Sequence, residues 1–177
     1  MGAMGSSKSA SCAKAIVALG NPYRTDDGVG VALLRLLKRD GSSVVGDERD
    51  PGNPLPITRH PSRVELIEGV HDGLRLAEAL VGYERALVVD AAPWLPVGEV
   101  ARYRLEDLPA TAGYPHGLGF RAALEMLARV GEEGVPEVEV LAIGVPGDPP
   151  FGEGLSPAVE KALPMALEEA IRWLNEK

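Results

Sequence analysis

The sequence predicts an α/β fold in which two helical layers enclose a mostly parallel sheet of about five strands. Two observations lead to this prediction. Short apolar runs recur along the chain, at residues 15–19, 64–68, 85–90 and 137–144, and an alternating run at 100–105 has the pattern of an edge strand. Segments with the apolar spacing of helices lie between and after these runs, at about residues 26–39, 74–80, 120–129 and 157–175.

The composition is that of a single globular domain. A chain of 177 residues can bury one substantial core but hardly two, and no apolar run approaches the length of a membrane span. The formal net charge is −8, and lysine and arginine do not cluster. A nucleic acid or an anionic membrane is therefore disfavoured as a partner, and cations or basic peptides are better candidates. We also expect the protein to be a monomer.

The N-terminal residues 1–13 are rich in small side chains and lack the apolar stretch of a secretory signal. We interpret them as a tag remnant or a disordered N-terminus, and residues 14–177 as one α/β domain. Cys12 is the only cysteine, which excludes a disulfide framework and a cysteine-based metal site. A cytoplasmic location fits this usage.

The segment LGNPYRTDDGVG, residues 19–30, connects the first strand to the first helix. In such units the loop lies at the carboxyl edge of the sheet, where open α/β sheets bind their ligands. Thr25 is a suitable N-cap for the helix, and an acidic residue in the first turn favours the helix dipole. One of Asp26 and Asp27 can therefore be structural, but capping does not require two adjacent acids.

Three interpretations of this loop compete. Gly28 and Gly30 begin a dinucleotide fingerprint, but Leu33 replaces its third glycine, and the acids occupy the place where a pyrophosphate needs free amides. A purely structural loop is the second interpretation. The third, which we favour, is a loop whose carboxylates face a cation.

Two further residues are candidates for the same site. Asp90 ends the run 85–90, so we expect it at the carboxyl edge, level with the acidic loop, although it can alternatively cap the turn that follows. His116 lies in a loop just before the helix at 120–129. A lone histidine is more often a packing or surface residue, but on a loop beside two carboxylates it becomes a candidate ligand.

Other polar segments carry weaker signals. His71 also follows a strand at the expected edge, whereas His60 lies in the irregular, proline-rich segment 41–63 and is assigned to the surface. That segment is either a functional flap or a passive insertion. Ser156 and Pro157 have the pattern of an N-cap and a first helical proline, and they predict a terminal helix that ends near Asn175.

The residue types favour metal chemistry. The chain has neither a GxSxG nucleophile elbow nor an HExxH zinc motif. Two carboxylates and one imidazole, from Asp27, Asp90 and His116, leave coordination positions open and suit a divalent cation such as nickel or zinc. The residues alone thus indicate a metal-facing site at a sheet edge.

Four motifs together resemble the [NiFe]-hydrogenase maturation endopeptidases, peptidase family M52: GNPYRTDDGVG at 20–30, VVDA at 88–91, PH at 115–116 and GLSP at 154–157. The resemblance implies a phosphorylase/hydrolase-like fold and a cytoplasmic endopeptidase. Such an enzyme removes a C-terminal extension from the precursor of a hydrogenase large subunit after nickel has been inserted. The family's nickel-recognising and catalytic positions fall on Asp27, Asp90 and His116. Nickel is then supplied by the substrate, and no tightly bound resident cofactor is expected.

Two other functions remain open at this stage. One is a different metal-dependent hydrolase on the same scaffold, and the other is a non-catalytic homologue that checks or binds the metal. The chain also departs from the family at residues 68–73, where EGVHDG replaces a glycine-rich DGGT-like turn. With three ligands only, the free protein should bind metal weakly, and more weakly at acid pH, where His116 takes up a proton.

Overall fold

The computed structural model describes residues 14–40, 64–68, 73–109, 117–129 and 134–176. These residues form a five-stranded sheet in the order β2-β1-β3-β5-β4. Four strands are parallel and the edge strand β4 is antiparallel to β5. The strand bounds are Lys14–Ala18 for β1, Val64–Glu68 for β2, Arg85–Ala92 for β3, Val100–Arg104 for β4 and Glu137–Gly144 for β5. The predicted α/β fold class is confirmed.

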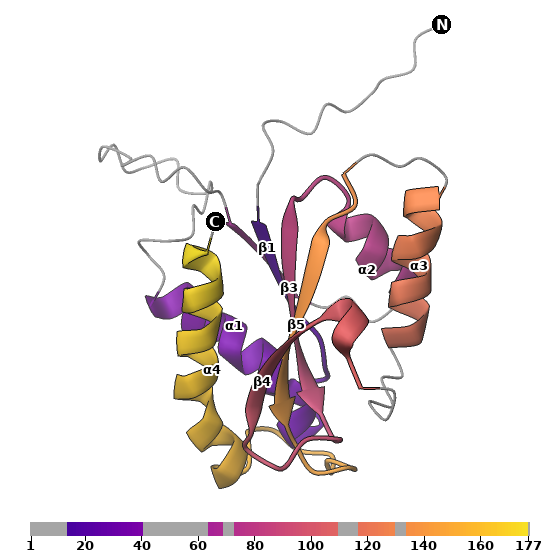
Figure 1. Ribbon diagram of the computed structural model, residues 1–177. Helices are drawn as coiled ribbons and strands as arrows, with labels where there is room; N and C mark the ends of the chain where they lie inside the picture. The colour runs from indigo at the N-terminus through magenta and orange to yellow at the C-terminus, as the bar shows by residue number, and fades with distance from the viewer. Residues whose placement is uncertain (1–13, 41–63, 69–72, 110–116, 130–133, 177) are drawn as a thin grey trace, which may run out of the picture.

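Two helices cover each face of the sheet (Figure 1). The helices α1, Val29–Asp40, and α4, Pro157–Asn175, lie on one side. On the other side are α2, Gly73–Leu80, and α3, Gly117–Arg129. Among the described residues, none of the helices combines the length and the apolar character needed to cross a membrane.

The core consists of two apolar clusters, one on each face of the sheet. Ile16, Leu87 and Leu141 point to the α1/α4 side, where Trp173 of α4 is fully buried. The alternate positions along the same strands pack against α2 and α3. Because both faces of the central strands are covered, their sequences are apolar without alternation.

The strand register places Asp90 at the height of the first loop. Ala18, the last residue of β1, pairs with Val89, and the Leu19 amide donates to the Val89 carbonyl oxygen at 2.9 Å. The prediction that β3 ends at Asp90 is wrong, because the strand continues for two residues that pair with β5. Asp90 therefore lies just inside the carboxyl end of β3.

Two predicted helix starts also need correction. Thr25 is no N-cap: it lies inside a short 3-10 helix, Thr25–Gly28, with φ of +40°, and its hydroxyl donates to the Pro150 carbonyl oxygen at 3.2 Å. The helix expected from residue 120 begins at Gly117. Ser156 occupies the predicted N-cap position of α4, but its side chain makes no capping hydrogen bond.

At the amino edge of the sheet, Lys14 holds the end of α4. Its ammonium group is buried and donates to the Leu174 carbonyl oxygen at 3.0 Å and to the Trp173 carbonyl oxygen at 3.3 Å. These carbonyls are among those that a helix end leaves without partners in the helix. Burial lowers the pKa of Lys14. The first strand and the last helix are thereby joined.

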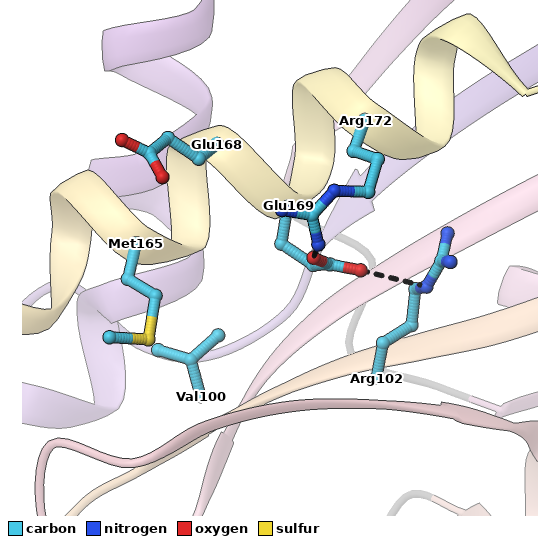
Figure 2. A pocket seen from close by; sticks show the side chains of 6 residues that line it. All are labelled: Val100, Arg102, Met165, Glu168, Glu169 and Arg172. Atoms are coloured by element: carbon cyan, nitrogen blue, oxygen red, sulfur yellow. Dashed lines mark hydrogen bonds and ion pairs between the residues drawn. The ribbon is translucent and has the colours of Figure 1, made fainter.

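An ion network surrounds this contact. Arg102 binds both carboxylate oxygens of Glu176 through its two terminal nitrogens, at 3.0 and 2.6 Å. Figure 2 shows the outer part of the network, where Arg102 contacts Glu169 at 3.1 Å in a hollow between β4 and α4. Arg102 therefore connects the edge strand β4 to Glu169 in α4 and to Glu176, the residue that follows α4.

This bidentate contact predicts a pH dependence of stability. The hydrogen bond from Arg102 holds the pKa of Glu176 below its usual value of 4.5. The stabilisation is therefore present above pH 4.5 and is lost as the pH falls through the lower pKa of the folded state. We expect Glu176→Gln to lower stability at pH 7 by less than about 1 kcal/mol, because the carboxylate is partly exposed, and to have little effect at pH 3. Thermal unfolding at both pH values measures this.

Glu168→Gln provides the control, since Glu168 is an exposed acid of α4, the helix that Glu176 follows, and makes no ion pair to any described residue (Figure 2). A loss of stability in Glu176→Gln that is equal at pH 3 and pH 7 would contradict the ionic origin of the effect.

Candidate functional site

The first loop folds back closely on its own acidic residues. Gly20 has φ of +103°, and a Cβ atom there would lie 1.9 Å from the Asp27 carbonyl oxygen. No other residue can occupy this position without moving the loop. Gly20 thus places the backbone of Asp27 directly against the end of β1.

A second glycine brings α1 onto the sheet. A Cβ atom on Gly30 would lie 2.7 Å from the Leu19 carbonyl oxygen and 2.8 Å from the Val89 carbonyl oxygen. The first turn of α1 therefore packs on the ends of both β1 and β3. This contact fixes the loop that precedes the helix relative to Asp90, the residue after Val89.

The two adjacent acids have different environments. Asp26 is only 3% exposed, and its Oδ1 accepts a hydrogen bond from the Ser156 amide at 2.6 Å. Asp27 is half-buried, and its Oδ2 accepts from the Asn21 amide at 2.8 Å. Among the described residues, nothing donates to the other oxygen of Asp27. Asp26 is therefore the structural acid, and Asp27 is the one that can bind a ligand.

Asp90 projects from the sheet toward the α2/α3 side. It alternates with Val89 and Ala91, which belong to the α1/α4 cluster, so its side chain points the other way. It is 6% exposed, and its Oδ1 accepts from the Ala91 amide at 2.8 Å. Because β5 is parallel to β3, the preceding helix α3 must begin at the carboxyl edge, on the side that Asp90 faces.

The structure thus brings Asp27 and Asp90 to the same edge of the sheet. The third predicted ligand, His116, lies outside the described residues, as do His60, His71, Cys12 and the segment 41–63. Within the described part of the chain, no three histidine, cysteine, aspartate or glutamate side chains are grouped so as to hold a metal ion. The three-residue site remains a prediction.

A second loop, residues 145–154, packs against the first one, and the sequence does not predict this contact. The Thr25 amide donates to the Gly152 carbonyl oxygen at 2.9 Å, and the Gly152 amide donates to the Tyr23 carbonyl oxygen at 3.0 Å. Arg24 makes an ion pair with Asp148 at 2.9 Å. The many glycines and prolines of residues 145–154 predict a loop, but not its partner, because the contacts span more than 120 residues.

A groove opens beside the acidic loop. It has a volume of about 530 Å3 and is bounded by the loop, the outer face of α1 and the end of β2. Its lining residues are Gly20, Asn21, Pro22, Tyr23, Val31, Arg35 and Glu68. Since the Asn21 amide binds Asp27, a ligand in this groove would lie next to that carboxylate.

The chain is similar in sequence and in structure to known proteins. A family model described as hydrogenase maturation protease matches residues 56–173, a span that contains Asp90 and His116. The hydrogenase maturating endopeptidase HybD from E. coli is similar in structure, with a TM-score of 0.68, 24% identity and 91% of each chain covered. HybD from Thermococcus kodakarensis, a [NiFe] hydrogenase maturation protease, has a TM-score of 0.66 and 25% identity over 92% of this chain and 99% of that chain. A search of curated proteins finds no match.

The contact at Gly30 predicts an unusual effect of alanine. In most helices Gly→Ala is stabilising by up to about 1 kcal/mol. Here the added methyl group meets two backbone oxygens that cannot rotate away, so we expect Gly30→Ala to destabilise the fold by about 1–3 kcal/mol. Urea unfolding measures the change. Gly147→Ala is the control, because no atom lies within 4 Å of the added methyl group, and equal stabilities of the two variants would contradict the proposed packing.

The structural role of Asp26 predicts that its substitution lowers the stability of the fold. Asp26→Ala leaves the partly buried Ser156 amide without its charged acceptor, which costs about 1–3 kcal/mol. Asp26→Asn should lose less, because the amide oxygen can still accept this hydrogen bond. Chemical denaturation of both variants measures the difference. If Asp26→Ala were as stable as the wild type, Asp26 would not be the structural acid.

Proposed function

The chain belongs to the hydrogenase maturation protease family, and on this basis we propose that it removes a C-terminal extension from the nickel-loaded precursor of a [NiFe]-hydrogenase large subunit. The observation that carries the proposal is that two carboxylates, Asp27 and Asp90, both lie at the carboxyl edge of the sheet, with a groove lined by Asn21 next to Asp27. In this proposal the protein acts as a monomer in the cytoplasm.

Nickel in this proposal is a part of the substrate, and the protein holds no tightly bound metal of its own. Asp27 contributes a carboxylate oxygen that no described group engages, and Asp90 contributes a second carboxylate on the neighbouring strand. His116, the residue that precedes α3 in the sequence, would complete the set. Oxygen and imidazole ligands suit nickel, and three of them leave positions for ligands from the precursor.

The chain's own residues would then act by positioning. Both carboxylates come from backbone that is held firmly, Asp90 within β3 and Asp27 through its contacts with Gly20 and Asn21. A precursor whose metal centre meets these groups would present its extension to the groove in one orientation, and such orientation lowers the entropic part of the barrier. A precursor without nickel would lack this contact, so cleavage would wait for metal insertion.

Incubation with a nickel-loaded large-subunit precursor tests the proposal. The wild type should release a C-terminal peptide, detected by mass spectrometry, and should not act on the nickel-free precursor. Asp27→Asn and Asp90→Asn remove a negative charge at nearly constant volume, and we expect each to reduce the cleavage rate at least 100-fold. Asp27→Asn should keep nearly the melting temperature of the wild type, because the amide oxygen can still accept from the Asn21 amide.

Asp107→Asn, at an exposed acid outside the site, is the control and should cleave normally. Binding of the precursor without any cleavage by the wild type would indicate a non-catalytic metal-checking protein. Full activity of Asp27→Asn would contradict the role of that carboxylate.

A further inference from the structure

Two aromatic side chains at the carboxyl edge are unusually exposed. Phe151 is 84% exposed and Tyr23 is 65% exposed, the highest values among the large hydrophobic residues that the structure describes. They lie on the two loops that meet beside Asp27. Folding gains little from aromatic side chains that remain in water, so their positions call for another explanation.

The two aromatic residues are held on a rigid base. The paired hydrogen bonds between Gly152 and the first loop connect the backbones next to both rings. The guanidinium group of Arg24 lies over the Phe151 ring, 5.3 Å from its centre, and is itself held by Asp148. We call Tyr23, Arg24 and Phe151 the aromatic platform. The backbone that carries the two rings therefore loses little further freedom when a partner binds, which favours affinity.

The aromatic platform is continuous with the candidate site. The Asp27 amide donates to the Arg24 carbonyl oxygen at 3.0 Å, and Tyr23 forms part of the groove next to Asp27. A protein whose peptide segment occupies this groove must therefore pass over or beside the aromatic platform. Tyr23 therefore belongs both to the platform and to the groove next to Asp27.

The charge and composition of the aromatic platform indicate how it binds. Arg24 is paired with Asp148, so the platform together with Asp148 carries no net charge in a chain whose formal net charge is −8. Charge attraction is thus a poor basis for recognition here, whereas aromatic rings beside an arginine are the composition of interface hot spots. The partner surface should be apolar.

We propose that the aromatic platform docks an apolar surface patch of the folded large-subunit precursor, next to the segment that carries the extension. This inference rests on the proposed function and adds a second contact to it. The carboxylates would recognise the metal centre, and the platform would supply most of the affinity for the protein around it. Recognition of the substrate is thereby divided between charge at Asp27 and Asp90 and apolar contact at Phe151.

Phe151→Ala tests the inference, with Met165→Ala as the matched control. Met165 is also an exposed large apolar residue, 58% accessible, but it lies on α4 in the hollow shown in Figure 2. We expect Phe151→Ala to weaken binding of the nickel-loaded precursor at least 10-fold, measured by biolayer interferometry, and to raise KM by a similar factor while kcat at saturation stays unchanged. Met165→Ala should match the wild type, and Phe151→Leu should keep most of the affinity.

The outcomes separate this inference from the proposed function. If the wild type cleaves the precursor and Phe151→Ala binds it equally well, the aromatic platform is not the docking surface, while the proposed function stands. If the wild type binds but does not cleave, the proposed function fails, and the affinities still test the platform. If Phe151→Ala alters only self-association, measured by sedimentation velocity, the platform serves a second copy of the chain and the inference is overturned.

Discussion

The position of the candidate site depends on the close approach of α1 to the ends of β1 and β3. At Gly30 the helix meets the carbonyl oxygens of Leu19 and Val89, with no space for a side chain. Asp90 follows Val89 directly, and Asp27 precedes Gly30 by three residues. This backbone contact, together with the contacts of Asp27 with Gly20 and Asn21, therefore sets where the two carboxylates lie relative to each other.

The acid pair shows how one loop combines structural and functional roles. Asp26 binds the backbone at the start of α4, and the second loop binds Tyr23 and Thr25, so the two loops form one unit. This unit holds Thr25 in a left-handed conformation that is costly for a β-branched residue. Such strain persists only where the surroundings enforce it. With Asp26 engaged in this way, Asp27 is free to face a ligand.

The sequence was most informative where local pattern and topology act together. The uninterrupted apolar residues of β3 predicted a central parallel strand, and the topology then placed Asp90 at the carboxyl edge. It was least informative where the partner is distant in the chain. Thr25 has the chemistry of an N-cap, but a loop 125 residues away binds its hydroxyl group. The residue types around Asp26 and Asp27 do not show which acid is structural, because the Ser156 amide that binds Asp26 lies 130 residues further on.

The ion network and the candidate site occupy opposite ends of the sheet, and α4 connects them. At the amino edge, Lys14 binds the last turn of α4 and Arg102 binds Glu176, the residue after it. At the carboxyl edge, Asp26 binds Ser156, the residue before the first turn of α4. A helix of 19 residues spans about 28 Å, so loosening of one end need not displace the other. The groups that anchor the C-terminal residues can therefore contribute to stability without altering the geometry of Asp27 and Asp90. Asp26 differs from these groups, because it both binds the backbone before α4 and lies next to Asp27 in the same loop. Its loss should therefore affect the stability and also the position of Asp27.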